Sequence, residues 1–280
     1  MQLKLGFSPC PNDTFIFNAL VNGLVSDPEL SFQIELADVE ALNQSAIRRE
    51  ADITKLSFGT IPAVSADYQI LDAGSALGFG CGPLLVSKQI LSPDQLKNAR
   101  VAIPGFNTTA NLLMSMAYPE ILDKKAFLFS DIEDAVLRGD ADLGLIIHEN
   151  RFTYERRGLL KIADLGAWWE DTFQLPIPLG CIAIRRNLDE KIKQRVSGLI
   201  RKSVELAFQN PEATMPYVSA HAQAMEVEVM KQHISLYVNE YSVSLGNKGR
   251  NAVREMFRIA AKNKLASSVE EPLFIDSDLL

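Results

Sequence analysis

The chain has 280 residues, of which 47% are hydrophobic and 22% are charged, and this composition is ordinary for a globular protein. That length allows a large core arranged as one or two domains. The formal net charge of -7 argues against nucleic acid as a partner, because binding phosphates requires a basic surface, although a small anionic ligand needs only a local group of donors.

Short strand patterns and helix patterns alternate along the first half of the chain. Apolar or alternating runs predict strands over residues 3–7, 32–36, 52–58, 82–87, 100–103 and 143–148. The helix patterns lie at residues 15–20, 39–49, after Ser92, at 112–116 and from Ser130 to about Gly139. Ser92 and Ser130 each have a Gln or Glu three residues later, which predicts two capping boxes, and residues 11–13 supply a turn and a possible N-cap. This alternation indicates an α/β fold with parallel pairing and right-handed crossovers.

The second half is helical after about residue 186. A long helix begins near Asn187, carries an apolar stripe that includes Val196 and Ile200, and stops at Asn210-Pro211. Further helices are expected over residues 215–224, 227–238 and 249–262, and residues 267–280 look irregular.

The chain contains no flexible linker, so two domains would be joined by extended segments that cross between them. The runs 82–87 and 179–185 fit this purpose. We therefore expect one discontinuous α/β domain from residues 1–87 and 181–280, a second α/β domain from 88–180, and a ligand cleft between them.

Cysteine usage and the N-terminus both favour a cytoplasmic protein. Cys10, Cys81 and Cys181 are widely spaced and match neither a disulfide framework nor a zinc pattern, which suits a reducing compartment. The first residues lack the features of a signal peptide, and no apolar stretch approaches the roughly 18 to 20 residues that span a bilayer. We expect no membrane partner, and the sequence does not indicate an oligomeric state.

His148 follows the apolar run 143–147, at the carboxyl end of a predicted strand, where open α/β sheets bind ligands. Its ordinary pKa of about 6.5 suits proton transfer near neutral pH. Two interpretations stand: a general base, or a structural histidine hydrogen-bonded at a strand end. If the strand continues, Glu149 points to the opposite face and does not orient the imidazole.

Two further groups of polar residues are candidates for binding a ligand. Thr108 and Thr109 lie in a loop between a strand and a helix, where they would bind an anion or simply cap the helix. Lys55 and Ser57 share one face at the end of another strand, where they would hold a carboxylate or hydroxyl, or be solvated.

For the remaining residues that could take part in chemistry, the sequence favours structural roles. Cys10 has no neighbouring histidine or cation in sequence, so we expect a rigid turn that shapes the pocket rather than a nucleophile. The glycine-rich residues 74–82 are a hinge, a backbone wall or a plain loop, and Trp168-Trp169 favours core packing over ligand stacking. His221 and His233 lack partners at metal-ligand spacing, so both are expected to be structural or exposed, and no metal site is predicted.

Five segments, taken together, resemble one family. They are SPCPNDTFIF at 8–17, TKLS at 54–57, GLIIHE at 144–149, RFTY at 151–154 and DLGAWW at 164–169, in order within residues 3–262. The family is that of the 1,4-dihydroxy-6-naphthoate synthases, which serve the futalosine route to menaquinone. Asn150 and residues 79–81 differ from the family's usual form.

The resemblance implies a two-domain fold like that of type II periplasmic binding proteins. It implies a lyase that converts cyclic dehypoxanthine futalosine to 1,4-dihydroxy-6-naphthoate and dihydroxyacetone, without a cofactor. It also implies that His148 is the proton acceptor and that Lys55, Leu56, Ser57, Thr108 and Thr109 bind the substrate. The alternatives are a chorismate dehydratase of the same pathway and a non-catalytic protein that binds a small solute.

Overall fold

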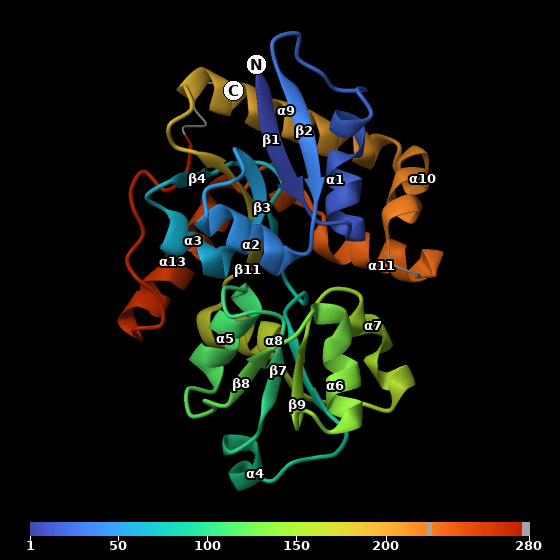
Figure 1. Ribbon diagram of the computed structural model, residues 1–280, viewed down its shortest axis with the longest axis vertical. Helices are drawn as coiled ribbons and strands as arrows, with labels where there is room; N and C mark the ends of the chain where they lie inside the picture. Colours follow the sequence, from blue (N-terminus) through green and yellow to red (C-terminus); the bar gives the residue numbers. More distant parts are fainter. Residues whose placement is uncertain (223–225, 276–280) are drawn as a thin grey trace.

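The computed structural model describes residues 1–222 and 226–275, and these form two lobes stacked along the long axis of the molecule (Figure 1). The upper lobe holds a six-stranded sheet in the order β2-β1-β3-β11-β4, and β5 also pairs with β11. Its strands are β1 (Gln2–Phe7), β2 (Ser31–Leu36), β3 (Ile53–Ser57), β4 (Tyr68–Ile70), β5 (Ala76–Gly78) and β11 (Ile177–Arg185).

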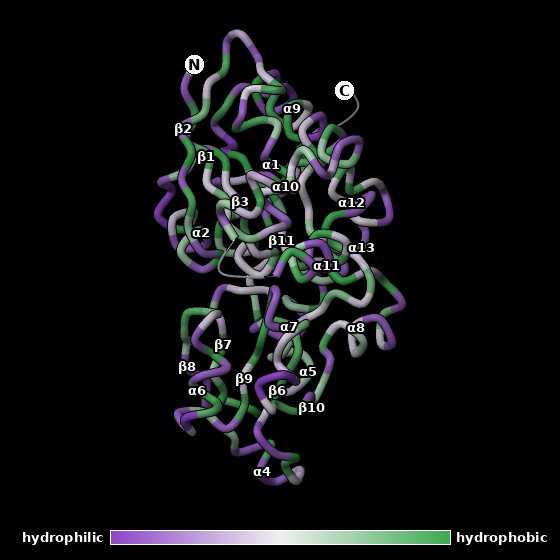
Figure 2. The backbone as a smooth tube through the Cα atoms, turned by 90° about the vertical axis from the view of Figure 1, so that its right-hand side faces the viewer, coloured by the Kyte–Doolittle hydropathy of each residue, from purple (hydrophilic) through white to green (hydrophobic). Residues whose placement is uncertain are grey.

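The lower lobe holds a five-stranded sheet in the order β10-β6-β9-β7-β8. Its strands are β6 (Leu84–Ser87), β7 (Val101–Ile103), β8 (Lys124–Ala126), β9 (Leu143–Ile146) and β10 (Leu160–Asp164). Figure 2, turned by 90° from Figure 1, shows the same division into two lobes. These elements confirm the predicted two-domain α/β architecture.

Helices cover both sheets. Those of the upper lobe are α1 (Pro11–Val21), α2 (Val39–Ile47), α3 (Ile61–Val64), α9 (Glu190–Gln209), α10 (Pro211–His221), α11 (Val227–Tyr237), α12 (Glu240–Val243) and α13 (Gly246–Lys262). Those of the lower lobe are α4 (Pro93–Lys97), α5 (Thr109–Ala117), α6 (Ile132–Arg138), α7 (Asn150–Thr153) and α8 (Leu165–Phe173). The chain also forms three short 3-10 turns, η1 (Phe58–Thr60), η2 (Phe129–Asp131) and η3 (Tyr154–Arg157). Helix α1 packs against α9, α10 and α11, and the predicted stripe of α9, including Val196 and Ile200, is buried.

Strand direction differs from the prediction where the chain crosses between lobes. As expected, β1 is parallel to β2 and β3, and β7 is parallel to β8 and β9. However, β6 is antiparallel to β9, and β11 is antiparallel to β3. Both strands enter their sheet from the other lobe rather than through a helical crossover, so the parallel rule for βαβ units does not apply to them. We propose domain limits from sheet membership: the second domain would begin just before Leu84, where β6 enters the lower sheet, and end just before Ile177, where β11 enters the upper sheet.

Of the helix starts predicted from the sequence, one is confirmed and two differ. The capping box at Ser92 is confirmed, with the Ser92 side chain accepting from the backbone of Gln95. The box expected at Ser130 is absent from the described structure, because η2 precedes α6 and Asp131 enters that helix already in helical geometry. Helix α1 begins at Pro11, with Cys10 as its N-cap residue, and the described structure has no side-chain hydrogen bond at this cap. Residues 223–225, which include the end of one predicted helix, and 276–280 lie outside the described residues.

The largest apolar cluster contains residues of both lobes. Leu56 and Phe58 from the upper lobe pack in the same cluster as Leu113 and Trp169 from the lower lobe. Trp169 is fully buried and its indole nitrogen donates to Pro176, which confirms core packing for that residue. In the described part of the chain, no helix combines the length and apolarity required to cross a membrane.

Candidate active site

A cavity of about 90 Å³ lies between the lobes. Its walls come from the loop after β1, the start of α1, the end of β3, the start of α5, the turn after β9, β11 and α11. The cavity is lined by all the residues predicted to form the site, namely Lys55, Leu56, Ser57, Thr108, Thr109 and His148.

His148 lies at this cavity in an unusual backbone conformation. Strand β9 ends at Ile146, and His148 follows in a turn with φ of 58°, in the left-handed region that non-glycine residues rarely adopt. Its ring lies 5.1 Å from the ring of Phe129 and 5.9 Å from that of His233, almost parallel to the latter at 8°. Such strain is found at positions where the surrounding structure holds a functional side chain in place.

The protonation of His148 is set by its surroundings. Loss of hydration lowers the pKa of His148 below its ordinary value of 6.5. The negative charges of Glu149 and Asp13 partly oppose this shift, while the charge of Lys55 adds to it. The imidazole is therefore neutral at neutral pH, as a proton acceptor must be.

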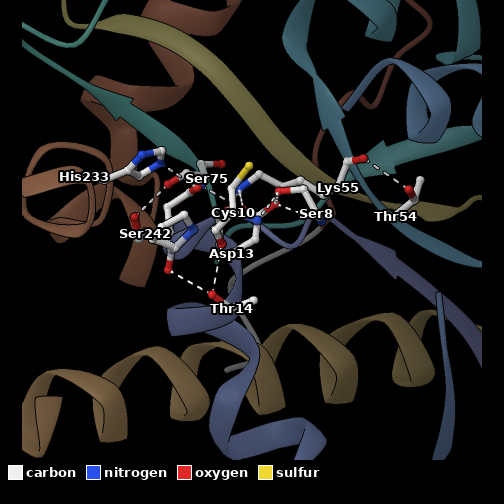
Figure 3. A network of polar contacts seen from close by, with 12 residues as sticks. Ser8, Cys10, Asp13, Thr14, Thr54, Lys55, Ser75, His233 and Ser242 are labelled. Atoms are coloured by element: carbon white, nitrogen blue, oxygen red, sulfur yellow. Dashed lines mark hydrogen bonds and ion pairs between the residues drawn. The ribbon is translucent and has the colours of Figure 1, made fainter. Parts of the chain in front are cut away.

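Lys55 is not a solvated strand end, so that interpretation was wrong. Its side chain is buried, and its ammonium lies 3.0 Å from Oδ1 of Asp13 and donates to the carbonyl of Gly74. Asp13 also accepts hydrogen bonds from the hydroxyl of Ser8 at 2.7 Å and from the amide of Asn12 at 2.9 Å (Figure 3). Lys55 thus keeps one of its three N–H groups for a ligand, with its charge already balanced.

The same network reaches His233 on α11. Nε2 of His233 lies 3.0 Å from Oδ1 of Asn12, whose amide nitrogen donates to Asp13. An amide oxygen only accepts, so Nε2 carries the proton and Nδ1 presents a lone pair. His233 is fully buried, and Figure 3 shows it at one end of the polar network, with Lys55 toward the other.

Thr108 and Thr109 line the cavity and also serve local structure. Thr108 caps α5, accepting from the backbone of Asn111 at 3.2 Å and donating to Gly105. The hydroxyl of Thr109 donates to the carbonyl of Leu179 at 2.6 Å, which joins α5 to β11. Their hydroxyl hydrogens are therefore engaged, and the donors that remain are the unpaired N–H groups in the first turn of α5.

A second contact joins the lobes at the loop before α5. The side chain of Asn107 donates to Oε1 of Glu40 on α2 at 2.9 Å, and its carbonyl accepts from the hydroxyl of Thr60 at 2.8 Å. Gly105, with φ of 146°, passes so close to Glu40 that a Cβ would lie 2.5 Å from its carboxylate. These contacts hold the loop that carries Thr108 against the upper lobe.

Several residues of the site were not predicted from the sequence. Asp13 and Asn12 follow the first strand, and their position at a carboxyl strand end was the available signal. His233 was expected to be structural or exposed, and it is buried, with Nε2 at 3.0 Å from Asn12. Its place beside the His148 ring was not predicted, because no local pattern connects His233 to His148 or to Asn12, which is 221 residues away in the chain.

The alternation expected for Glu149 if the strand continued does not apply, because β9 ends at Ile146. The possible ligand atoms of Glu149, His148 and Cys10 lie within 4.8 Å of one another, a spacing that one metal ion could bridge. Burial, and to a smaller extent the charge of Glu149, raises the pKa of the Cys10 thiol well above its ordinary value. This agrees with the prediction that Cys10 is not an activated nucleophile.

Comparisons with known proteins agree with this architecture. The family model described as menaquinone biosynthesis matches residues 3–262. The chain is 43% identical over 273 residues to a 1,4-dihydroxy-6-naphtoate synthase of Thermus thermophilus, covering 98% of this chain and 99% of that protein. It is 40% identical over 272 residues to the enzyme of the same name from Streptomyces coelicolor, covering 95% of each.

Solved structures show the same fold. A crystal structure of a protein from Archaeoglobus fulgidus matches with a TM-score of 0.89 and 32% identity, over 94% of this chain and 98% of that one. A Candida albicans protein described as having the generic periplasmic binding protein fold matches over 100% of both chains, with a TM-score of 0.66 and 13% identity. The second likeness concerns the fold alone, and it agrees with the expected periplasmic-binding-protein-like architecture.

Proposed function

Because this chain belongs to the menaquinone biosynthesis family, we propose that it is a carbon-carbon lyase. The proposed reaction converts cyclic dehypoxanthine futalosine to 1,4-dihydroxy-6-naphthoate and dihydroxyacetone. Support for this choice comes from the two relatives, at 43% and 40% identity over nearly their whole length, which share the name of that synthase.

The observation that carries the mechanism is a neutral histidine at the cavity between the lobes. His148 lines the cavity, and its lowered pKa leaves the imidazole unprotonated at neutral pH. In the proposed reaction His148 removes a proton from the bound substrate, the bond to the sugar-derived fragment breaks, and the bicyclic ring becomes aromatic. The strained turn and the rings of Phe129 and His233 hold the imidazole in one orientation, which favours proton transfer.

Substrate binding is assigned to the groups around His148 that keep unused hydrogen-bonding capacity. The hydroxyl of Ser57 accepts from Asn43 at 3.2 Å and retains its own hydrogen for a ligand. Lys55 offers its third N–H, and the first turn of α5, at Thr108 and Thr109, offers backbone N–H groups and a partial positive charge to a carboxylate. Leu56 contributes an apolar part of the wall.

Binding also requires the lobes to move. A volume of about 90 Å³ is small compared with the roughly 300–1,000 Å³ of most ligand sites. We propose that substrate enters a more open form and that the lobes then close, with Glu40 and Asn107 in contact, as in the described structure. Closure would exclude water and bring the substrate against His148.

The test is incubation of the purified chain with cyclic dehypoxanthine futalosine, with naphthoate absorbance as the readout. The expected result is naphthoate together with an equal amount of dihydroxyacetone. Chorismate is the matched control substrate, and its consumption in place of futalosine would overturn the assignment in favour of a dehydratase. Tight binding of the futalosine without any product would favour a solute-binding protein instead.

A further inference from the structure

We propose that Cys10, His148, Glu149 and His233 together form a Zn²⁺ site at the edge of the cavity. The thiol of Cys10, a ring nitrogen of His148 and a carboxylate oxygen of Glu149 lie within 4.8 Å of one another. His233 does not belong to this group of three, but its Nδ1 lies 3.9 Å from Oε2 of Glu149, so a small shift of its ring toward the ion would make it the fourth donor.

Two of these donor atoms are buried and lack partners. Within the described residues, Oε2 of Glu149 and Nδ1 of His233 accept no hydrogen bond. Buried polar atoms in native structures nearly always have a hydrogen-bond partner. Two such atoms without a partner, only 3.9 Å from each other, therefore require an explanation. A bound cation would satisfy both atoms at once.

Hydrogen bonds through Asn12 to Asp13 already orient His233 for a metal ion. Its Nε2 donates to Asn12, whose amide donates in turn to Asp13. This chain of hydrogen bonds leaves the lone pair on Nδ1, the nitrogen nearer to Glu149. Metal-bound histidines are commonly held in this way, with the other ring nitrogen donating to an oxygen.

The kind of donor indicates the ion. One thiolate, one carboxylate and two imidazoles form a mixed sulfur, nitrogen and oxygen set that suits zinc and is unlike the all-oxygen sites of calcium and magnesium. When Zn²⁺ binds, the Cys10 thiol gives its proton to solvent. The two negative charges of Cys10 and Glu149 then balance the charge of the ion, so the buried site becomes neutral.

Occupation of this site would remove the free lone pair of His148. The ion is therefore an inhibitor rather than a cofactor of the proposed reaction. This consequence rests on the proposed function, whereas binding of the ion does not.

The experiment uses the full chain, freed of metal with a chelator and titrated with Co²⁺ as a coloured substitute for Zn²⁺. We expect one ion per chain, a sulfur-to-cobalt charge-transfer band, and loss of that band when Zn²⁺ is added. Cys10→Ser should abolish the band, whereas Cys181→Ser, which alters a buried thiol outside the cluster, should keep it. The proposal is overturned if the native chain gives no band or if Cys10→Ser keeps it.

A second pair of variants tests the fourth ligand. His233→Gln should weaken Zn²⁺ binding about tenfold or more in competition with a chromophoric chelator, while His221→Gln, on α10, should not. Equal affinities in these two variants would contradict the site. If a variant fails to fold, X-ray absorption of the zinc-loaded native chain decides, because the proposal requires one sulfur among the neighbours of the ion.

Discussion

Replacing His148 by Asn separates the chemistry of this residue from its backbone strain. His148 has φ of 58°, and Asn adopts this left-handed region more readily than most residues. His148→Asn therefore removes the proton acceptor while the turn keeps its shape. Loss of a general base costs roughly 10²–10⁴ in rate, equivalent to about 3–5 kcal/mol of transition-state stabilisation.

His148→Ala is the matched comparison. Alanine loses the same base but also pays about 1–2 kcal/mol for the left-handed conformation. We expect both variants to lose turnover to a similar extent, and only His148→Ala to melt several degrees lower, at about 2–4 °C per kcal/mol.

Turnover is measured from naphthoate absorbance, substrate affinity by calorimetry and stability by thermal melting. Both variants should still bind substrate. Near-normal turnover in His148→Asn would refute the role of His148 as the base. Equal melting temperatures for the two variants would refute the argument from backbone strain.

Three further predictions concern pH, closure and packing. The pH below which kcat/KM falls should lie under 6.5, because the lowered pKa of His148 means that the base becomes protonated only at more acidic pH. A fall in kcat/KM that begins above pH 6.5 would contradict this. Asn107→Asp places a second carboxylate at hydrogen-bond distance from Glu40, and repulsion between the two opposes closure of the lobes. KM should rise about tenfold, equivalent to about 1.4 kcal/mol, and X-ray scattering should give a larger radius of gyration; an unchanged KM would contradict a role of the Asn107–Glu40 contact in closure. Gly82→Ala would put a Cβ 2.2 Å from the backbone nitrogen of Gly166, so the free energy of unfolding should fall by about 1–3 kcal/mol. Thermal melting measures this, and a melting temperature equal to that of the native chain would contradict the close packing of Gly82 on Gly166.

Local patterns were sufficient to predict most of the fold. Apolar runs located the strand predicted at residues 3–7, the long helix α9, and the strand predicted at 143–148, which in the structure ends at Ile146. Burial of one face, or of the whole strand, determines these patterns. Strands β4 and β5, at Tyr68–Ile70 and Ala76–Gly78, were missed. They are only three residues long and acquire their pairing from β11, about a hundred residues later in the chain.

The candidate site was predictable only in part, for a related reason. His148 and Thr108 were found because they follow predicted strands, and strand ends converge at one edge of a sheet. His233 was not, since it reaches the site from a helix whose position depends on the tertiary packing of α1 and α11. The alternation of a strand could not be applied to Glu149, because β9 ends at Ile146 and His148 follows in a left-handed turn.

The position of β11 also bears on how the protein is made. In the upper sheet β11 lies between β3 and β4, yet the chain reaches it only after the whole lower lobe has been synthesised. At roughly 5–20 residues per second, a ribosome needs several seconds or more to travel from β4 to β11. During that time one edge of β3 is unpaired and exposed, which is the kind of surface that chaperones protect. Co-translational folding should therefore begin with the lower lobe, and the N-terminal sheet should close last.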